Sequence, residues 1–164
     1  MKIEKNYFKE KIKNDEVVYG LWVTTASPYM AEMVATIGYD WVLVDGEHGP
    51  NTVDSLLTQR QAFYGYDTHP VVRPVESSAA YVKQVLDLGY QTILLPMIDT
   101  KEMAEEAVKS VYYAPRGHRG VGASVARASK WNAISDYMSS AEEELCVLVQ
   151  VESVEAVKNL DEIL

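Results

Sequence analysis

The sequence predicts an α/β protein in which short parallel strands alternate with helices. Short apolar runs recur along the chain, and several are apolar on consecutive residues instead of alternate ones. Such runs are typical of parallel strands that are covered on both faces. Amphipathic segments with helical spacing separate most of them. The expected strands are Val18–Val23, Trp41–Val44, Pro70–Arg73, Thr92–Ile98 and Leu145–Val151.

Capping residues and apolar spacing define the helices between these strands. Ser27 precedes Pro28, which combines a capping hydroxyl with proline at the first helical position. The other expected helix starts are Asn51, Thr100 and Ser153, and the expected ends include Gly38 and Gly89. In chain order, the residues expected to face inward are Met30, Met33, Val34 and Ile37, then Val53, Leu56 and Leu57, then Val82, Val85 and Leu86, then Met103, Ala107 and Val108, and finally Val154, Val157 and Leu160.

This alternation fits two architectures, a doubly wound open sheet and part of a (β/α)8 barrel. No glycine-rich phosphate motif follows the first strand, which argues against a dinucleotide-binding fold. We expect a single domain spanning residues 1–164, because no linker or internal repeat interrupts the pattern. A long irregular stretch from Tyr112 to Ser140 is expected to be a functional loop.

The composition is that of an acidic globular protein. Asp and Glu total 24 against 15 Lys and Arg, for a formal net charge of −9, so nucleic acid and anionic membranes are not expected partners. The only cysteine, Cys146, cannot form an internal disulfide and is expected to be an inert core residue in a reducing compartment. The charged N-terminus lacks the apolar segment of a signal peptide, and no run approaches the ~20 residues that span a bilayer. We therefore expect a cytoplasmic protein.

Polar residues follow the second expected strand, where both parallel architectures bind ligands. Asp45, Glu47 and His48 lie within four residues on a glycine-bounded turn. An aspartate beside a histidine can fix its tautomer and raise its basicity, which makes an acid/base pair. The alternative is that Asp45 caps the turn and His48 is an ordinary loop histidine.

The ends of two later strands carry further polar candidates. Arg73 is suited to bind a carboxylate or a developing enolate, or it pairs with a neighbouring acid such as Glu47. Strand alternation puts Gln150 and Glu152 on one face, where Glu152 can bind a hard divalent cation or simply cap a helix. The glycine- and arginine-rich loop 116–122 can receive an anion or merely form turns. His69 and His118 are expected in loops, without a role.

Together these segments resemble the HpcH/HpaI family of class II pyruvate aldolases. The matching segments are GLWVTTASP, GYDWVLVDGEHGPN, PVVRP, GYQTILLPMI, YAPRGHRGVGASVARASKWN and LCVLVQVES, in the order and spacing of the family. The resemblance implies a fold of the (β/α)8 TIM-barrel type with a bound divalent ion such as Mg, Mn or Co. It also implies reversible retro-aldol cleavage of a 4-hydroxy-2-oxo acid into pyruvate and an aldehyde, and a homo-oligomer when the barrel is complete.

The resemblance also assigns roles to five residues. Glu152 matches a metal ligand, and Gln150 matches a residue beside the metal-site water or substrate. Arg73 matches the arginine that steadies the keto or enolate oxygen. His48, with Asp45 behind it, matches a dyad that acts as acid and base through water.

The departure from the family pattern lies at the end of the chain. The family's second metal ligand is an aspartate in a G-P-x-D-L-S segment, and the sequence ends before any such segment. Only about five of the eight βα units are expected, so the barrel is incomplete. Besides an aldolase completed by another chain, two alternatives remain: an inactive fragment of a barrel, and a citrate lyase-like member of the same superfamily.

Overall fold

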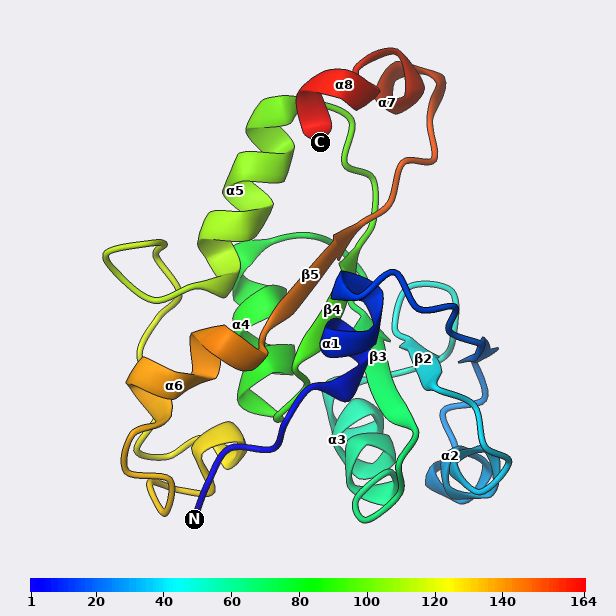
Figure 1. Ribbon diagram of the computed structural model, residues 1–164, viewed down its shortest axis with the longest axis vertical. Helices are drawn as coiled ribbons and strands as arrows, with labels where there is room; N and C mark the ends of the chain where they lie inside the picture. The colour runs from blue at the N-terminus through cyan, green and yellow to red at the C-terminus, as the bar shows by residue number, and fades with distance from the viewer.

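A computed structural model describes residues 1–164 and shows a parallel five-stranded sheet in the order β1-β2-β3-β4-β5 (Figure 1). Each strand pairs with its neighbour in sequence, which is the order of successive right-handed βα units. The strands are β1 (Gly20–Val23), β2 (Trp41–Asp45), β3 (His69–Arg73), β4 (Thr92–Leu95) and β5 (Cys146–Val149). The helices are α1 (Tyr7–Lys13), α2 (Pro28–Ala35), α3 (Val53–Ala62), α4 (Ala79–Asp87), α5 (Lys101–Val111), α6 (Tyr137–Glu144), α7 (Val154–Lys158) and α8 (Leu160–Ile163), with a 3-10 turn at Arg127–Ser129. The α/β prediction is confirmed.

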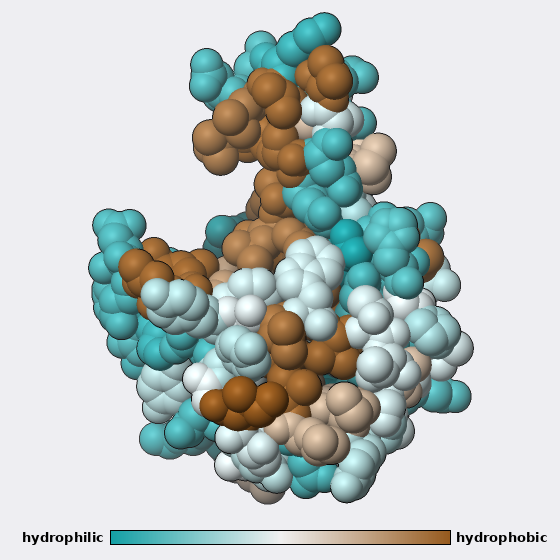
Figure 2. Space-filling model, turned by 90° about the vertical axis from the view of Figure 1, so that its right-hand side faces the viewer, coloured by the Kyte–Doolittle hydropathy of each residue, from teal (hydrophilic) through white to brown (hydrophobic).

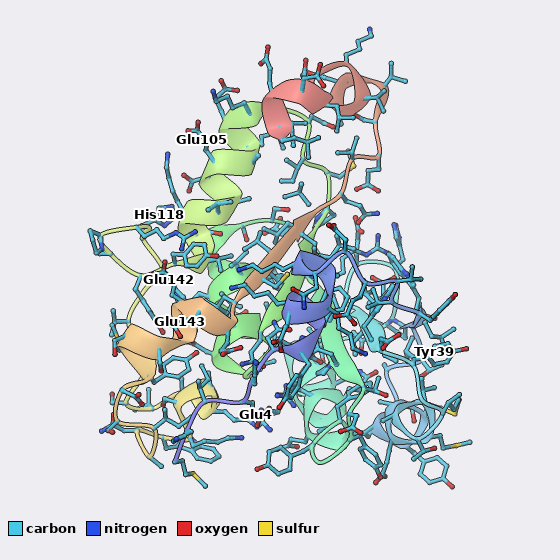
Figure 3. The ribbon with its side chains drawn as sticks, in the orientation of Figure 1. Glu4, Tyr39, Glu105, His118, Glu142 and Glu143 are labelled. Atoms are coloured by element: carbon cyan, nitrogen blue, oxygen red, sulfur yellow. The ribbon has the colours of Figure 1, made fainter.

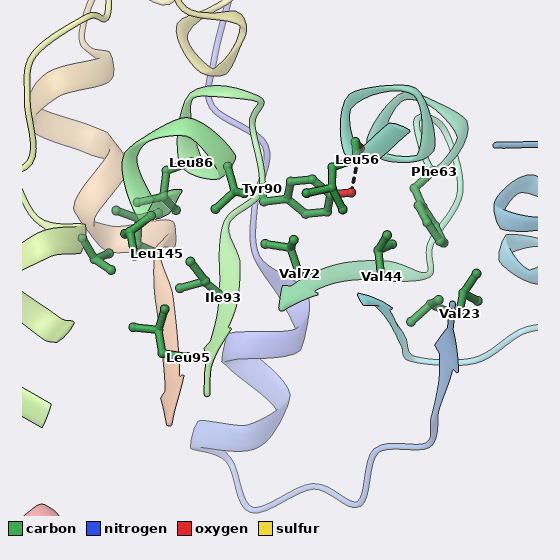
Figure 4. Close-up of a cluster of buried hydrophobic side chains, with 14 of the residues drawn as sticks. Val23, Val44, Leu56, Phe63, Val72, Leu86, Tyr90, Ile93, Leu95 and Leu145 are labelled. Carbon is green, nitrogen blue, oxygen red and sulfur yellow. Dashed lines mark hydrogen bonds between the residues drawn. The ribbon is translucent and has the colours of Figure 1, made fainter. Parts of the chain in front are cut away.

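The main core lies between one face of the sheet and the helices that connect its strands. Val44, Val72 and Ile93 point into it from β2, β3 and β4 and are fully enclosed (Figure 4). Tyr90 is buried among them, and its hydroxyl donates to the Leu56 carbonyl at 2.8 Å. Burying each such side chain contributes about 1.5–3 kcal/mol. This packing fixes where the carboxyl ends of the strands lie.

The opposite face of the sheet carries a smaller cluster. Leu43, Val71 and Cys146 alternate with the core-facing residues of their strands, and Phe8 of α1 packs against them. Cys146 is buried there as predicted, and burial raises the pKa of its thiol.

Several helix ends follow the sequence prediction. Ser27, Thr100 and Ser153 each accept a hydrogen bond from a backbone N–H of the first turn, and Gly38 and Gly89 adopt positive φ after α2 and α4. The prediction for α3 was wrong by one residue, because Thr52 caps it through a reciprocal bond with Ser55. The expected loop from Tyr112 to Ser140 is also partly wrong, since α6 begins at Tyr137.

Of the residues predicted to face inward from α2 only Val34 does so, and the predicted inward face of α7 was wrong. Ala31, Val34 and Ala35 face the core from α2, whereas Met30, Met33 and Ile37 are 38%, 49% and 65% exposed. Ala31 and Ala35 form a second apolar stripe that overlaps the predicted one, and α2 packs on the core through this stripe because small side chains allow a close approach. On α7 and α8, Val154, Val157 and Leu160 are likewise exposed, and Ala156 is enclosed instead.

These exposed residues form two apolar areas at opposite ends of the molecule. Figure 2 shows hydrophobic residues gathered on the end formed by α7 and α8 and again on the lower face near α2. Exposed apolar patches on a globular protein often mark an interface. None of the helices combines the length and apolar composition needed to cross a bilayer.

The amino ends of the strands are closed by α1, which the sequence analysis did not anticipate. His69 lies on β3 and not in a loop, which corrects the prediction for that residue. Its ring stacks on Phe8 with centroids 5.8 Å apart, and Nε2 is 2.8 Å from Thr92 Oγ1. Asn6 Nδ2 donates to the same hydroxyl oxygen at 2.9 Å, so Thr92 bonds to both side chains. Burial of the imidazole favours its neutral form and lowers its pKa.

Acid is expected to destabilise the protein through His69. Burial lowers the pKa of His69 to about 3 from an ordinary value of 6.5. The unfolded chain takes up this proton below pH 6.5 while the folded chain does not, so stability falls as the pH drops from 6.5 towards 3. We expect a loss of about 2–3 kcal/mol between pH 6.5 and 4.5 from this residue alone.

Urea unfolding at a series of pH values measures this loss. His69→Gln keeps a side chain that can bond to Thr92 but removes the titrating group. The difference in pH slope between the two proteins isolates the histidine, and equal slopes would contradict a neutral buried imidazole.

Candidate active site at the carboxyl ends of the strands

The carboxyl ends of β2 and β3 are joined by a buried ion pair. The two strands place Asp45 and Arg73 opposite each other in register. Arg73 Nε donates to Asp45 Oδ1 at 2.9 Å, and Nη2 donates to Oδ2 at 2.7 Å. The side chains are only 5% and 2% exposed. This two-point geometry is the strongest form of a guanidinium–carboxylate contact and fixes the plane of the guanidinium.

Both members of the pair are held in their charged forms. Burial alone would raise the pKa of Asp45, but hydrogen bonds from Arg73 and from the backbone N–H groups of Glu47 and His48 outweigh it and lower the pKa. Burial likewise acts to lower the pKa of Arg73, and the Asp45 carboxylate overcomes it and raises the pKa. The site thus contains a permanent, oriented positive charge.

The turn after β2 wraps around the Asp45 carboxylate. Oδ1 accepts from the backbone N–H of Glu47 at 3.0 Å and of His48 at 3.3 Å. Gly46 is required here, because a Cβ on it would lie 2.7 Å from the Arg73 carbonyl oxygen. Asn51 Nδ2 donates to the Asp45 carbonyl at 2.7 Å and ties the turn to the start of α3. The capping role predicted for Asp45 is therefore present together with its ion pair.

The remaining edge of Arg73 faces β5. Its Nη1 donates to Gln150 Oε1 at 3.2 Å and lies 2.8 Å from Glu47 Oε2. The Trp22 ring of β1 covers the guanidinium, with its centroid 4.6 Å from Cζ. Sequence reasoning named Glu47 as a pairing partner for Arg73 but missed Trp22, whose position near the end of β1 was the available indication.

Gln150 connects Arg73 to Glu152. Its Nε2 donates to Glu152 Oε2 at 3.0 Å, while Glu152 Oε1 accepts from the Met97 backbone N–H at 2.8 Å. Met97 has a left-handed backbone with φ of 54°, which aims this N–H at the carboxylate. The next amide, of Ile98, bonds to the Gln150 carbonyl at 3.3 Å. Nothing in the sequence indicates this conformation at a methionine.

His48 stands apart from this array. Its side chain is 73% exposed, and Nε2 lies 3.8 Å from Glu47 Oε2. Asp45 contacts the His48 backbone N–H and not the imidazole, since both carboxylate oxygens serve Arg73. The structure therefore brings Asp45, Arg73, Gln150 and Glu152 into one connected array, with His48 at its solvent side.

One carboxylate at the strand ends is of the type that binds a hard cation. Glu152 is exposed to solvent and presents carboxylate oxygens, the donor type that Mg²⁺ and Mn²⁺ prefer. No group of three or more His, Cys, Asp or Glu side chains is arranged to enclose an ion. Glu152 therefore fits as one ligand of an ion that takes its other ligands from water, substrate or further protein groups.

The cations of the loop 116–122 are paired elsewhere. Arg116 pairs with Glu142, and Arg119 Nη2 pairs with Asp87 at 2.7 Å. His118 pairs with Glu106 at 2.7 Å and lies at the outer margin of the molecule beside α5 (Figure 3). This loop is tied to the helical layer.

Residues 18–164 match the family model described as HpcH/HpaI aldolase/citrate lyase. The chain belongs to the HpcH/HpaI family. A 2-keto-3-deoxy-L-rhamnonate aldolase of Escherichia coli O1:K1 / APEC is 55% identical over 159 residues, which cover 97% of this chain and 60% of that relative.

Solved structures of the HpcH/HpaI family agree with the fold. A family protein from Burkholderia cenocepacia J2315 superposes with a TM-score of 0.94 at 34% identity, over 97% of this chain and 64% of the other. An HpcH/HpaI aldolase from Desulfitobacterium hafniense DCB-2 superposes with a TM-score of 0.83 at 25% identity, over 94% and 60%. The chain thus spans about three-fifths of the length of these relatives, which agrees with the expectation of a partial barrel.

Proposed function

We propose that this chain carries the pyruvate-binding part of an aldolase that reversibly cleaves a 4-hydroxy-2-oxo acid into pyruvate and an aldehyde. The observation that carries the proposal is the continuous array Asp45–Arg73–Gln150–Glu152 across the ends of β2, β3 and β5. It sets a fixed positive charge and an exposed carboxylate at the two ends of one amide side chain. A small 2-oxo acid has matching features, with two oxygen-bearing groups on adjacent carbons.

Each side chain of the array has a separate part in this proposal. Arg73 attracts the oxygen on which negative charge develops when the carbon–carbon bond breaks, and Asp45 holds its guanidinium still. Gln150 orients both neighbours through its two amide ends. His48, exposed at the edge of the site, exchanges a proton with the hydroxyl of the aldehyde portion through water.

A divalent cation, Mg, Mn or Co, is part of the proposal, with Glu152 as one ligand. Such an ion would supply the Lewis acidity that stabilises charge on a keto oxygen. The carboxylate is already held by Met97 and Gln150, so little reorganisation is needed to bind the ion. The apolar residues exposed on α7 and α8 are then available to contact the rest of a barrel or other subunits.

The name of the E. coli relative suggests a 2-keto-3-deoxy sugar acid as the substrate class. The description of the family also includes citrate lyase, so a citryl-type substrate is the second candidate. In the first case the enolate forms on pyruvate and the other product is an aldehyde, whereas in the second the enolate forms on the acetyl portion and the other product is a 2-oxo acid. Product analysis with both substrate types distinguishes them.

Proton exchange at the pyruvate methyl group tests the proposal directly. The chain is assayed in D₂O by NMR, alone and mixed with the part of the E. coli relative that lies outside the matched 60%. We expect exchange in the mixture with Mn²⁺ or Mg²⁺, and none after EDTA. The added segment alone is the control. A soluble mixture that shows no exchange with excess metal would favour the alternative of an inactive fragment.

A further inference from the structure

Arg73 has two carboxylate neighbours, and the two contacts differ in quality. Both oxygens of Asp45 accept well-aligned hydrogen bonds from Arg73. Glu47 Oε2 lies as close, 2.8 Å from Nη1, yet it is enclosed and makes no properly directed hydrogen bond. Hydrogen bonds weaken steeply when they are misaligned, so the Glu47 contact is mainly an attraction between charges. Asp45 is therefore held to Arg73 by two directed hydrogen bonds, whereas Glu47 is held only by attraction between the charges.

The position of Glu47 coincides with the part of Arg73 that a ligand needs. Nε and Nη2 are committed to Asp45, which leaves the Nη1 edge to bind an incoming oxygen. That edge faces Gln150 and, through it, Glu152. Glu47 is the anionic group that occupies it in the ligand-free protein.

We propose that Glu47 is a displaceable carboxylate that competes with the substrate for Arg73 and so determines which anions bind. This inference rests on the proposed function, because it concerns the same arginine. A 2-oxo acid displaces Glu47 from Nη1, and the freed carboxylate turns towards His48, whose Nε2 is already only 3.8 Å away. A simple anion such as acetate makes only its contact with Arg73, and this contact alone must offset the free energy of separating Glu47 from Arg73. A 2-oxo acid has further oxygens that can interact near Glu152, and these contacts help to offset the same free energy.

Oxamate, an unreactive isostere of pyruvate, is the probe for this competition. Its dissociation constant is measured by calorimetry with Mn²⁺ for the natural chain and for Glu47→Gln. We expect Glu47→Gln to bind oxamate about tenfold more tightly, which corresponds to one lost charge pair at a partly enclosed site. Acetate should gain at least as much, so that the preference for oxamate over acetate does not increase.

Two further variants separate this effect from a general change in charge. Glu76→Gln removes one exposed negative charge that has no ion-pair partner, and it should leave oxamate binding unchanged. In an Arg73→Lys background, which lacks the Nη1 edge, the gain from Glu47→Gln should disappear. Unchanged or weaker oxamate binding by Glu47→Gln would overturn the inference.

If no variant binds oxamate, that result counts against the proposed function. Urea unfolding then still tests whether Glu47 is a displaceable partner of Arg73. If Glu47 interacts with Arg73 through charge attraction without a directed hydrogen bond, Glu47→Gln should shift the urea midpoint by at most about a third of the shift caused by Asp45→Asn. Equal shifts would show that Glu47 is a structural partner of Arg73 and not an exchangeable one.

Discussion

Asp45→Asn is expected to lower the free energy of unfolding by about 3 kcal/mol at pH 7. The change leaves the buried Arg73 guanidinium without the carboxylate that holds it at two points. Removing one partner of a buried ion pair typically costs about 3–5 kcal/mol, and the nearby Glu47 should keep the loss at the lower end. Because the pKa of Asp45 is lowered, its carboxylate is fully charged at this pH.

Urea unfolding measures this loss of unfolding free energy, and two further variants serve as comparisons. The triple variant Asp45→Leu/Glu47→Gln/Arg73→Met removes all three neighbouring charges and should recover most of the stability, because no buried charge remains unpaired. Glu76→Gln, at an exposed position, should change stability by less than about 0.5 kcal/mol. If Asp45→Asn unfolds like the natural protein, the pair is more hydrated than its burial indicates.

Glu152→Gln is expected to reduce the rate of pyruvate proton exchange about a thousandfold. The glutamine can still accept the hydrogen bond from Met97, so the loop after β4 should keep its conformation. What disappears is the negative charge that attracts the cation. The effect should therefore be accompanied by weaker Mn²⁺ binding, measured by electron paramagnetic resonance without any substrate.

Glu155→Gln is the matched control for this variant. Glu155 lies three residues further on, is exposed at the start of α7 and takes no part in the array. It should retain both exchange and Mn²⁺ binding. A Glu152→Gln protein with exchange within tenfold of the natural rate would show that the cation is held elsewhere.

The sequence predicted the approximate positions of the five strands and their parallel direction, because strand positions depend on apolar runs that are visible locally. Parallel order then places Asp45, Arg73 and Glu152 at one edge. Helix faces were predicted less well. On α2 two apolar stripes overlap, and only packing decides that Ala31 and Val34 are inward while Met33 is not.

The parts of the site that were missed depend on tertiary contacts. The stacking of Trp22 on Arg73 requires two strands to be brought together, and the orientation of Glu152 requires a left-handed backbone at Met97. Neither leaves a pattern in the local sequence. The family resemblance supplied roles for His48 and Asp45, yet in this structure the Asp45 carboxylate serves Arg73 and the imidazole lies closer to Glu47.

The attachment of α1 has a consequence for the order in which the protein is assembled during synthesis. Asn6 bonds to Glu144 through both its backbone N–H, at 2.6 Å, and its side chain, at 2.8 Å, across 138 residues. As the ribosome extends the chain, Phe8 can first contact Leu43 of β2 and then Val71 and His69 of β3, but the two bonds to Glu144 form only after that residue has emerged. The first helix is therefore fixed in its final place only when the chain has been extended almost to β5.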